Sequence, residues 1–202
     1  MKGFAPLVSM LAPVLLLAAC AGPGSKQAHR YFVLEVPGST AAAAATKSDA
    51  TLLVAPTIAA AFYDTQDIVF SRSAGTRAYY QFSSWTEPPS RRLDALLASR
   101  LERASTFRTA GLAASGIKGS LLLRTRLDEL YHDAATPPGV ARITLTAELI
   151  DPEKGLLLGR RTFTAEAPVA SYDADGAVQG LRQALATLLD DVSAWVVGVT
   201  AP

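Results

Sequence analysis

The stretch Ala141-Arg142-Ile143-Thr144-Leu145-Thr146-Ala147-Glu148-Leu149-Ile150 alternates apolar and polar side chains with a period of two. Strict alternation over this length is typical of a half-buried β-strand. The apolar face consists of Ile143, Leu145, Ala147 and Leu149, and the polar face of Arg142, Thr144, Thr146 and Glu148. A strand patterned in this way indicates an antiparallel sheet that is covered on one side and open to water on the other.

Further extended segments surround this strand on both sides in the sequence. Residues 121–131 precede it, and residues 156–167 follow it after a turn with the sequence Asp-Pro-Glu-Lys-Gly at 151–155. Earlier in the chain, strand composition is found at 31–36, 51–55, 67–72 and 77–82, and the last two flank a glycine-containing loop typical of a hairpin. Residues 38–49 include five consecutive alanines without a patterned face, so we expect a loop or frayed turn there.

Two amphipathic helices are predicted. The first begins near Pro88 and Pro89, which suit a first helical turn because its N–H groups lack intrahelical partners. Its apolar stripe is Leu93, Leu96, Leu97, Leu101 and Ala104, while Arg91, Arg92, Arg100 and Arg103 take other faces and are expected to be solvated. The second follows a cap at Asp173 or Asp175. Its apolar face is Val178, Leu181, Leu185, Leu188, Leu189, Val192 and Trp195 or Val196.

Strands followed by segregated helices predict an α+β fold. We expect a mainly antiparallel or mixed sheet with the two principal amphipathic helices packed on one of its faces. Residues 30–202 would form a single domain, and residues 20–29 a flexible tether of small and polar residues.

The N-terminus resembles the signal and lipobox of a bacterial lipoprotein. A basic residue, Lys2, precedes an apolar run, which ends in Leu17-Ala18-Ala19-Cys20. The resemblance implies that residues 1–19 are a signal peptide, that Cys20 carries a diacylglyceryl group, and that its new amino group is acylated, commonly with palmitate. Two or more acyl chains hold a protein stably on a bilayer. Ala21 stands where inner-membrane lipoproteins typically carry Asp, so the periplasmic face of the outer membrane is favoured.

Three other interpretations of the N-terminus are open. A membrane-spanning anchor needs about 20 predominantly apolar residues, whereas Pro13 interrupts this run and Gly22-Pro23-Gly24 ends it. An ordinary signal with an incidental Cys20, or a buried helix, would leave the chain without a lipid. The position of the only cysteine favours the lipoprotein interpretation.

Composition argues against nucleic-acid binding and against stabilisation by disulfides. The formal net charge is +1, so no basic excess points to nucleic acid. With Cys20 as the single cysteine, an intramolecular disulfide is impossible. Stability must therefore come from apolar burial.

No catalytic pattern emerges. His132 lies beside Asp133, and an adjacent carboxylate can orient a histidine as a base, but neither a Gly-x-Ser-x-Gly nor a His-Glu-x-x-His sequence occurs. We expect His132 to mark a polar strand end running into a surface loop, and His29 to lie in the tether. The sequence indicates a protein that is not an enzyme, with no metal site and no cofactor.

Four aromatic side chains are candidates for a partner-binding surface: Tyr79, Tyr80, Phe82 and Trp85. Aromatic residues are enriched in interface cores. The alternative is that a strand must bury one face, which would place at least half of these rings in the core.

Several segments together resemble the ABC-type transport auxiliary lipoprotein family, the PqiC-like lipoproteins. They are Tyr31-Phe32-Val33-Leu34, Leu53-Val54-Ala55-Pro56, the segment from Tyr63 to Arg72, Tyr79 to Trp85, Glu87-Pro88 and residues 149–196. The similarity covers nearly the whole chain after Cys20. Two departures are the alanines at 41–45 and at 59–61, where the family would have no insert and bulkier residues, respectively.

The resemblance implies a non-catalytic docking or adaptor subunit anchored in the outer membrane. Its partners would be an MCE-domain periplasmic protein with an inner-membrane permease and ATPase, and the assembly would move phospholipids or other lipophilic molecules between the membranes. Homo-oligomers are a further expectation from the family. Two alternatives remain: an envelope lipoprotein that assembles or activates a cell-wall enzyme, and one that itself binds a lipophilic ligand.

Overall fold

The computed structural model describes residues 27–36, 48–104 and 106–200. The predicted signal peptide, Cys20, most of the tether and the alanines at 41–45 lie outside these residues. The described strands are β1 (Arg30–Phe32), β2 (Ser48–Val54), β3 (Ile58–Ala59), β4 (Asp67–Ser71), β5 (Ala78–Trp85), β6 (Phe107–Leu112), β7 (Leu121–Asp133), β8 (Val140–Asp151) and β9 (Leu156–Pro168). The helices are α1 (Pro89–Arg103) and α2 (Ala174–Thr200), with short 3-10 turns at Ala61–Tyr63 and Ala113–Ser115.

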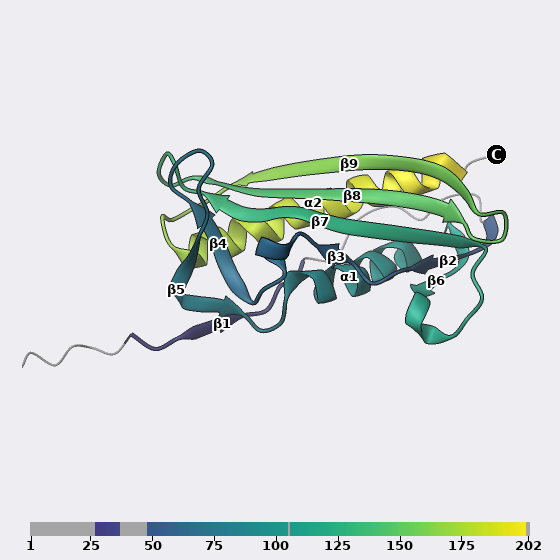
Figure 1. The fold of residues 1–202 in the computed structure, drawn as a ribbon, viewed down its shortest axis with the longest axis horizontal. Coiled ribbons are helices and arrows are strands. Elements are labelled where there is room, and N and C mark those ends of the chain that lie inside the picture. Colours follow the sequence, from purple (N-terminus) through teal and green to yellow (C-terminus); the bar gives the residue numbers. More distant parts are fainter. Residues whose placement is uncertain (1–26, 37–47, 105, 201–202) are drawn as a thin grey trace, which may run out of the picture.

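The three long strands β7, β8 and β9 form an antiparallel part of the sheet with β9 at its edge, and the alternating stretch predicts this pairing (Figure 1). Leu145 lies opposite Leu127 on β7 and Phe163 on β9. On the other face, Thr144 lies opposite Thr164. Matching residues on neighbouring strands therefore build one apolar and one polar face.

A β-bulge on β7 changes which residues reach the polar face. Leu127 pairs with Leu145 and Glu129 with Thr144, so β7 contains one extra residue at this point. Both Asp128 and Glu129 consequently meet threonines of β8: the Thr146 hydroxyl donates to Asp128 at 2.6 Å, and Thr144 donates to Glu129 at 3.5 Å. Two consecutive carboxylates share one face only because of this irregularity.

The other edge of β7 carries parallel strands. β2, β3 and β4 pair with successive parts of β7, and all three run parallel to it. β6 extends the sheet beyond β2, while β5 and then β1 extend it beyond β4. The α+β class with a mixed sheet is thereby confirmed, as is the antiparallel β4–β5 hairpin.

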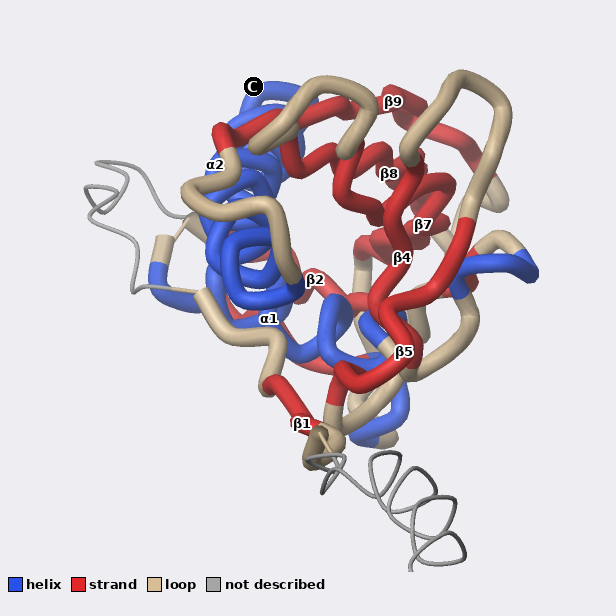
Figure 2. Tube along the Cα trace, turned by 90° about the vertical axis from the view of Figure 1, so that its left-hand side faces the viewer, coloured by secondary structure: helices blue, strands red, loops and turns tan. Residues whose placement is uncertain are grey.

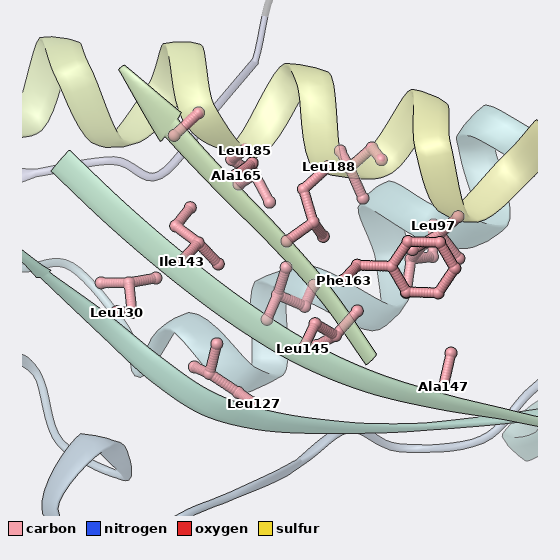
Figure 3. Packing of buried hydrophobic residues seen from close by; sticks show 14 of the residues in the cluster. Leu97, Leu127, Leu130, Ile143, Leu145, Ala147, Phe163, Ala165, Leu185 and Leu188 are labelled. Carbon is pink, nitrogen blue, oxygen red and sulfur yellow. The ribbon is translucent and has the colours of Figure 1, made fainter. Parts of the chain in front are cut away.

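Both helices lie on one side of the sheet. Viewed end-on, β9, β8, β7, β4 and β5 form a curved layer with α1 and α2 on the same side (Figure 2). α2 packs mainly on β8 and β9, and α1 on β6 and β2. Figure 3 shows Leu127, Ile143, Leu145 and Phe163 with Leu185 and Leu188 of α2 in one core. The apolar faces predicted for the middle strand and for both helices are confirmed.

The N-terminus of α2 is capped by Asp173. Its carboxylate accepts a hydrogen bond from the Gly176 N–H at 2.9 Å and one from the Ser171 hydroxyl at 2.8 Å. These bonds, the backbone bond first, lower the pKa of the Asp173 carboxyl below its ordinary value. Asp175 instead forms a 2.6 Å ion pair with Arg30, which connects α2 to the first strand.

One arginine expected on a solvated face is buried. Arg100 is only 3% exposed because it lies between the two helices. Its Nη2 donates to the carbonyl of Ala186 at 3.2 Å, and its Nε lies 3.3 Å from the Asp190 carboxylate. The guanidinium thus bridges α1 and α2, a role that the pattern within one helix cannot reveal.

Candidate functional site

The structure separates the four aromatic residues singled out in the sequence. Tyr79 and Phe82 are 40% and 38% exposed, Tyr80 is half-buried, and Trp85 is completely buried. A partner can therefore reach Tyr79 and Phe82 on the surface of β5, whereas Trp85 belongs to the core cluster. The expectation that Trp85 contributes to a contact surface is wrong, because the C-terminal part of β5 turns inward.

Tyr79 forms a stacked pair with Phe62, which we call the Phe62–Tyr79 pair. The ring centroids are 4.8 Å apart and the ring planes are inclined by 11°. The Tyr79 hydroxyl also donates to the carbonyl of Phe62 at 3.3 Å. Phe62 lies in the 3-10 turn before β4 and was missed in the sequence, since a turn of this length has no periodicity to detect.

An arginine next to this pair ties it to the sheet. Arg77 donates from Nε to the Tyr63 hydroxyl at 2.8 Å and from Nη2 to Glu129 at 3.0 Å. Its guanidinium carbon lies 3.8 Å from the centre of the Tyr131 ring, a cation–π contact. Burial raises the pKa of the Tyr63 hydroxyl. The turn that presents Phe62 is thus held against β7.

His132 is fully buried, although its loop 135–138 is exposed. Nε2 lies 2.8 Å from the Pro138 carbonyl, which can only accept, so Nε2 carries the hydrogen. Nδ1 consequently accepts from the Tyr80 hydroxyl at 2.7 Å. Gly139, at φ +102°, leaves the space that the imidazole occupies, because a Cβ there would collide with Nε2. The expectation of a polar strand end is corrected: the loop is at the surface, but the histidine is not.

Burial shifts both partners of this hydrogen bond towards their neutral forms. It lowers the pKa of His132, and it raises the pKa of Tyr80 to about 12 together with the nearby charges of Asp173 and Tyr172. Both imidazole nitrogens are occupied by the protein itself. His132 is therefore a structural residue that connects β5, β7 and the loop after β7.

Nothing in the described ranges assembles a metal site. Within residues 27–36, 48–104 and 106–200, no cluster of three or more His, Cys, Asp or Glu side chains is suited to hold an ion. His29 lies 2.9 Å from the Ser84 hydroxyl and 4.9 Å, centroid to centroid, from the Tyr31 ring. Neither described helix is long and apolar enough to span a bilayer.

Comparison with known proteins finds a matching family model and solved structures of similar fold. A family model for the ABC-type transport auxiliary lipoprotein component matches residues 32–193. No curated protein matches the chain by sequence.

Solved structures share the fold at low identity. A crystal structure of a Xanthomonas campestris protein is similar with a TM-score of 0.74 and 20% identity, over 84% of this chain and 96% of that one. An uncharacterized protein gives a TM-score of 0.67 and 15% identity over 84% and 99% of the two chains. A hypothetical protein of Chlamydia trachomatis gives 0.53 and 10% over 77% and 100%. At these identities, the likenesses show the fold alone.

Proposed function

This chain belongs to the ABC-type transport auxiliary lipoprotein family, and from that membership we propose that it is a docking subunit of an intermembrane transport system. The acylated Cys20 anchors it to the periplasmic face of the outer membrane. Its surface binds an MCE-domain periplasmic protein, which operates with an inner-membrane permease and ATPase on phospholipids or other lipophilic molecules. The subunit itself carries out no chemistry.

The observation that carries the docking role is the exposed Phe62–Tyr79 pair. Stacked rings fixed by a hydrogen bond lose little conformational entropy when a partner covers them. Large aromatic side chains are also common among the few residues that dominate binding energy. Arg77 holds the turn that carries the pair, so the surface is preformed rather than assembled on contact.

The lipid anchor limits how far the domain can lie from the membrane. Residues 20–29 precede β1, and ten extended residues span at most about 33–36 Å. The first strand, β1, begins at Arg30, and an ion pair to Asp175 connects this residue to α2. β1 would therefore lie within about 33–36 Å of the lipid leaflet.

Site-specific photo-crosslinking tests the docking surface. The full chain is expressed in its native envelope with a photoreactive phenylalanine derivative at Tyr79, and crosslinked proteins are identified by mass spectrometry. We expect the MCE-domain protein to be captured. Tyr172 is the matched control, since it is also an exposed tyrosine whose hydroxyl donates to a carbonyl. Capture of a cell-wall synthase from Tyr79 would instead support the role in activating an envelope enzyme.

A paired substitution tests the energy of the contact. The double variant Phe62→Ala, Tyr79→Ala should lower recovery of the MCE-domain protein at least tenfold, as expected for hot-spot residues worth about 2 kcal/mol or more. Tyr172→Ala should leave recovery unchanged. Intact-mass analysis of the same purified material tests the anchor: a bare Cys20 thiol or a retained signal peptide would contradict it.

A further inference from the structure

A hollow of about 380 Å³ lies on the polar face of the sheet, and neither ring of the Phe62–Tyr79 pair lines it. The first part of β7, the last part of β8 and the first part of β9 form its floor, and the segment containing β3 forms its apolar wall. Arg124, Arg126 and Arg160 line it together with Glu148, Thr146 and Ile58. Arg124 lies opposite Glu148 on β8, which in turn lies opposite Arg160 on β9.

The positive charge of this hollow is only partly neutralised. Arg126 forms a 2.7 Å ion pair with Asp128, and Arg160 lies 3.6 Å from Glu148. Arg124 is exposed and has no carboxylate within 4.0 Å among the described residues. Three guanidinium groups thus share two carboxylates, and the surplus charge falls at Arg124.

The opposite end of the same face shows that this surplus is not a general property of the sheet. There, Arg142 is bound by two carboxylates, Asp133 at 3.1 Å and Glu166 at 2.6 Å. Arg77 likewise has Glu129. Arg142 and Arg77 are thus neutralised by carboxylates of neighbouring strands, whereas the described residues provide only two carboxylates for the three arginines of the hollow.

The shape and chemistry of the hollow suit an anionic amphiphile. Guanidinium groups bind phosphate oxygens through paired N–H donors, and the Thr146 hydroxyl adds a polar group to the lining. The wall beside them is apolar: Ile58 is 68% exposed, and it lies opposite Arg126 in the β3–β7 pairing. A large exposed apolar side chain beside a cationic hollow offers separate contacts to a headgroup and to the first part of its hydrocarbon chain.

We propose that this hollow binds the phosphate group of an anionic ligand, with Arg124 and Arg160 as the principal donors. The assignment of a lipid as the source of that phosphate rests on the proposed transport function. The phosphate then supplies the negative charge that Arg124 does not receive from the described residues.

Native mass spectrometry of the full chain in an uncharged detergent tests the proposal without any transport partner. Three probes are titrated separately: phosphatidylglycerol, diacylglycerol of the same acyl composition, and inorganic phosphate. We expect phosphatidylglycerol to bind and diacylglycerol not to bind. Tighter binding of phosphatidylglycerol than of inorganic phosphate identifies the lipid headgroup as the source, whereas equal affinity identifies a free phosphate compound.

Three variants locate the site. Arg124→Gln should weaken phosphatidylglycerol binding about tenfold, because one charge-assisted contact is lost, and Arg124→Glu should weaken it further through repulsion. Arg108→Gln is the control, since Arg108 is an exposed arginine on β6 outside the hollow. Thermal unfolding verifies that all variants remain folded.

Two results would overturn the proposal: equal binding of diacylglycerol and phosphatidylglycerol, or equal effects of the Arg124 and Arg108 variants. Absence of binding by both phosphate-containing probes would do the same. None of these results affects capture of the MCE-domain protein through Tyr79, so failure of this site and failure of the docking function are distinguishable.

Discussion

The two faces of β7, β8 and β9 share one backbone but follow different rules. On the helix-covered face, Leu127, Leu145 and Phe163 meet in register and are buried by α2. Any set of well-packed apolar residues satisfies such a face. On the open face, each charged side chain needs a particular partner on a neighbouring strand. The comparison teaches that apolar patterning determines which face is buried, whereas strand register determines which charges are neutralised.

The strongest test of this contrast uses β5, where one strand contains both kinds of residue. Trp85→Ala should lower the free energy of unfolding by about 3–5 kcal/mol, because it empties a fully buried site. Phe82→Ala, a truncation of an exposed ring on the same strand, should change it by about 0.5 kcal/mol or less. Urea unfolding at constant temperature measures both. Equal losses would show that Phe82 is part of the core.

Adjacent residues of β8 provide the next test. Leu145→Ala should cost about 2–5 kcal/mol, since the cavity lies between two strands and α2. Thr144→Ala, one residue earlier and on the open face, should cost less than about 1 kcal/mol, the net worth of a typical hydrogen bond. The same urea titration compares them. A large loss of stability in Thr144→Ala would contradict this contrast, because it would mean that the Thr144 side chain is covered and not open to water.

His132 is a polar residue on the buried side of the sheet. Unlike its apolar neighbours, it should make the stability of the fold depend on pH. Burial holds the pKa of His132 below its ordinary value, so the unfolded chain binds a proton before the folded protein does. Above about pH 7 the residue makes no contribution to the pH dependence. As the pH falls through about 6.5, the folded state loses stability relative to the unfolded state.

The matched variant is His132→Gln, which keeps a polar side chain but does not titrate. Its free energy of unfolding should be lower at pH 7.5, yet it should decline less than that of the parent between pH 7 and pH 5. Chemical unfolding at several pH values measures the two slopes. Parallel slopes would show that His132 does not cause the acid sensitivity.

The smallest effect is expected for the neutralised end of the open face. Arg142→Gln removes ion pairs to Asp133 and Glu166, which are partly exposed, and should cost about 0.2–1 kcal/mol. The difference should shrink in 1 M salt, where the screening length falls to about 3 Å. Thermal unfolding at low and high salt measures it. An undiminished cost in high salt would indicate that packing of the Arg142 stem, rather than charge, is responsible.

Local sequence patterns predicted many of the strands and both helices. The alternation at 141–150, the hairpin around Gly75 and the leucine stripes of both helices act between near neighbours, and each is confirmed. β3 and β6 were not predicted, because β3 has only two residues and the six residues of β6 do not alternate clearly between apolar and polar side chains. The parallel pairing of β2, β3 and β4 with β7 was also missed, since such pairs join segments far apart in sequence.

The candidate binding surfaces were likewise predicted from the sequence only in part. Tyr79 and Phe82 were recognised as candidates from composition, while Phe62 became part of the surface only when its turn stacked on Tyr79. Lipidation at Cys20 and the single domain 30–202 remain predictions, since Cys20 lies outside the described residues and no comparison tests either one. The arginine hollow has no signature in sequence because its three guanidinium groups come from two strands separated by a third.

By itself, the amino-acid sequence determined the α+β class, the buried faces and the family of this protein, because periodicity and short motifs express interactions along one strand or helix. Only the tertiary structure decided that Arg100 and His132 are buried, that Trp85 points inward, and that no carboxylate of the described residues lies within 4.0 Å of Arg124. The physical reason is that burial and charge pairing are properties of neighbours in space, which strand register and helix docking bring together.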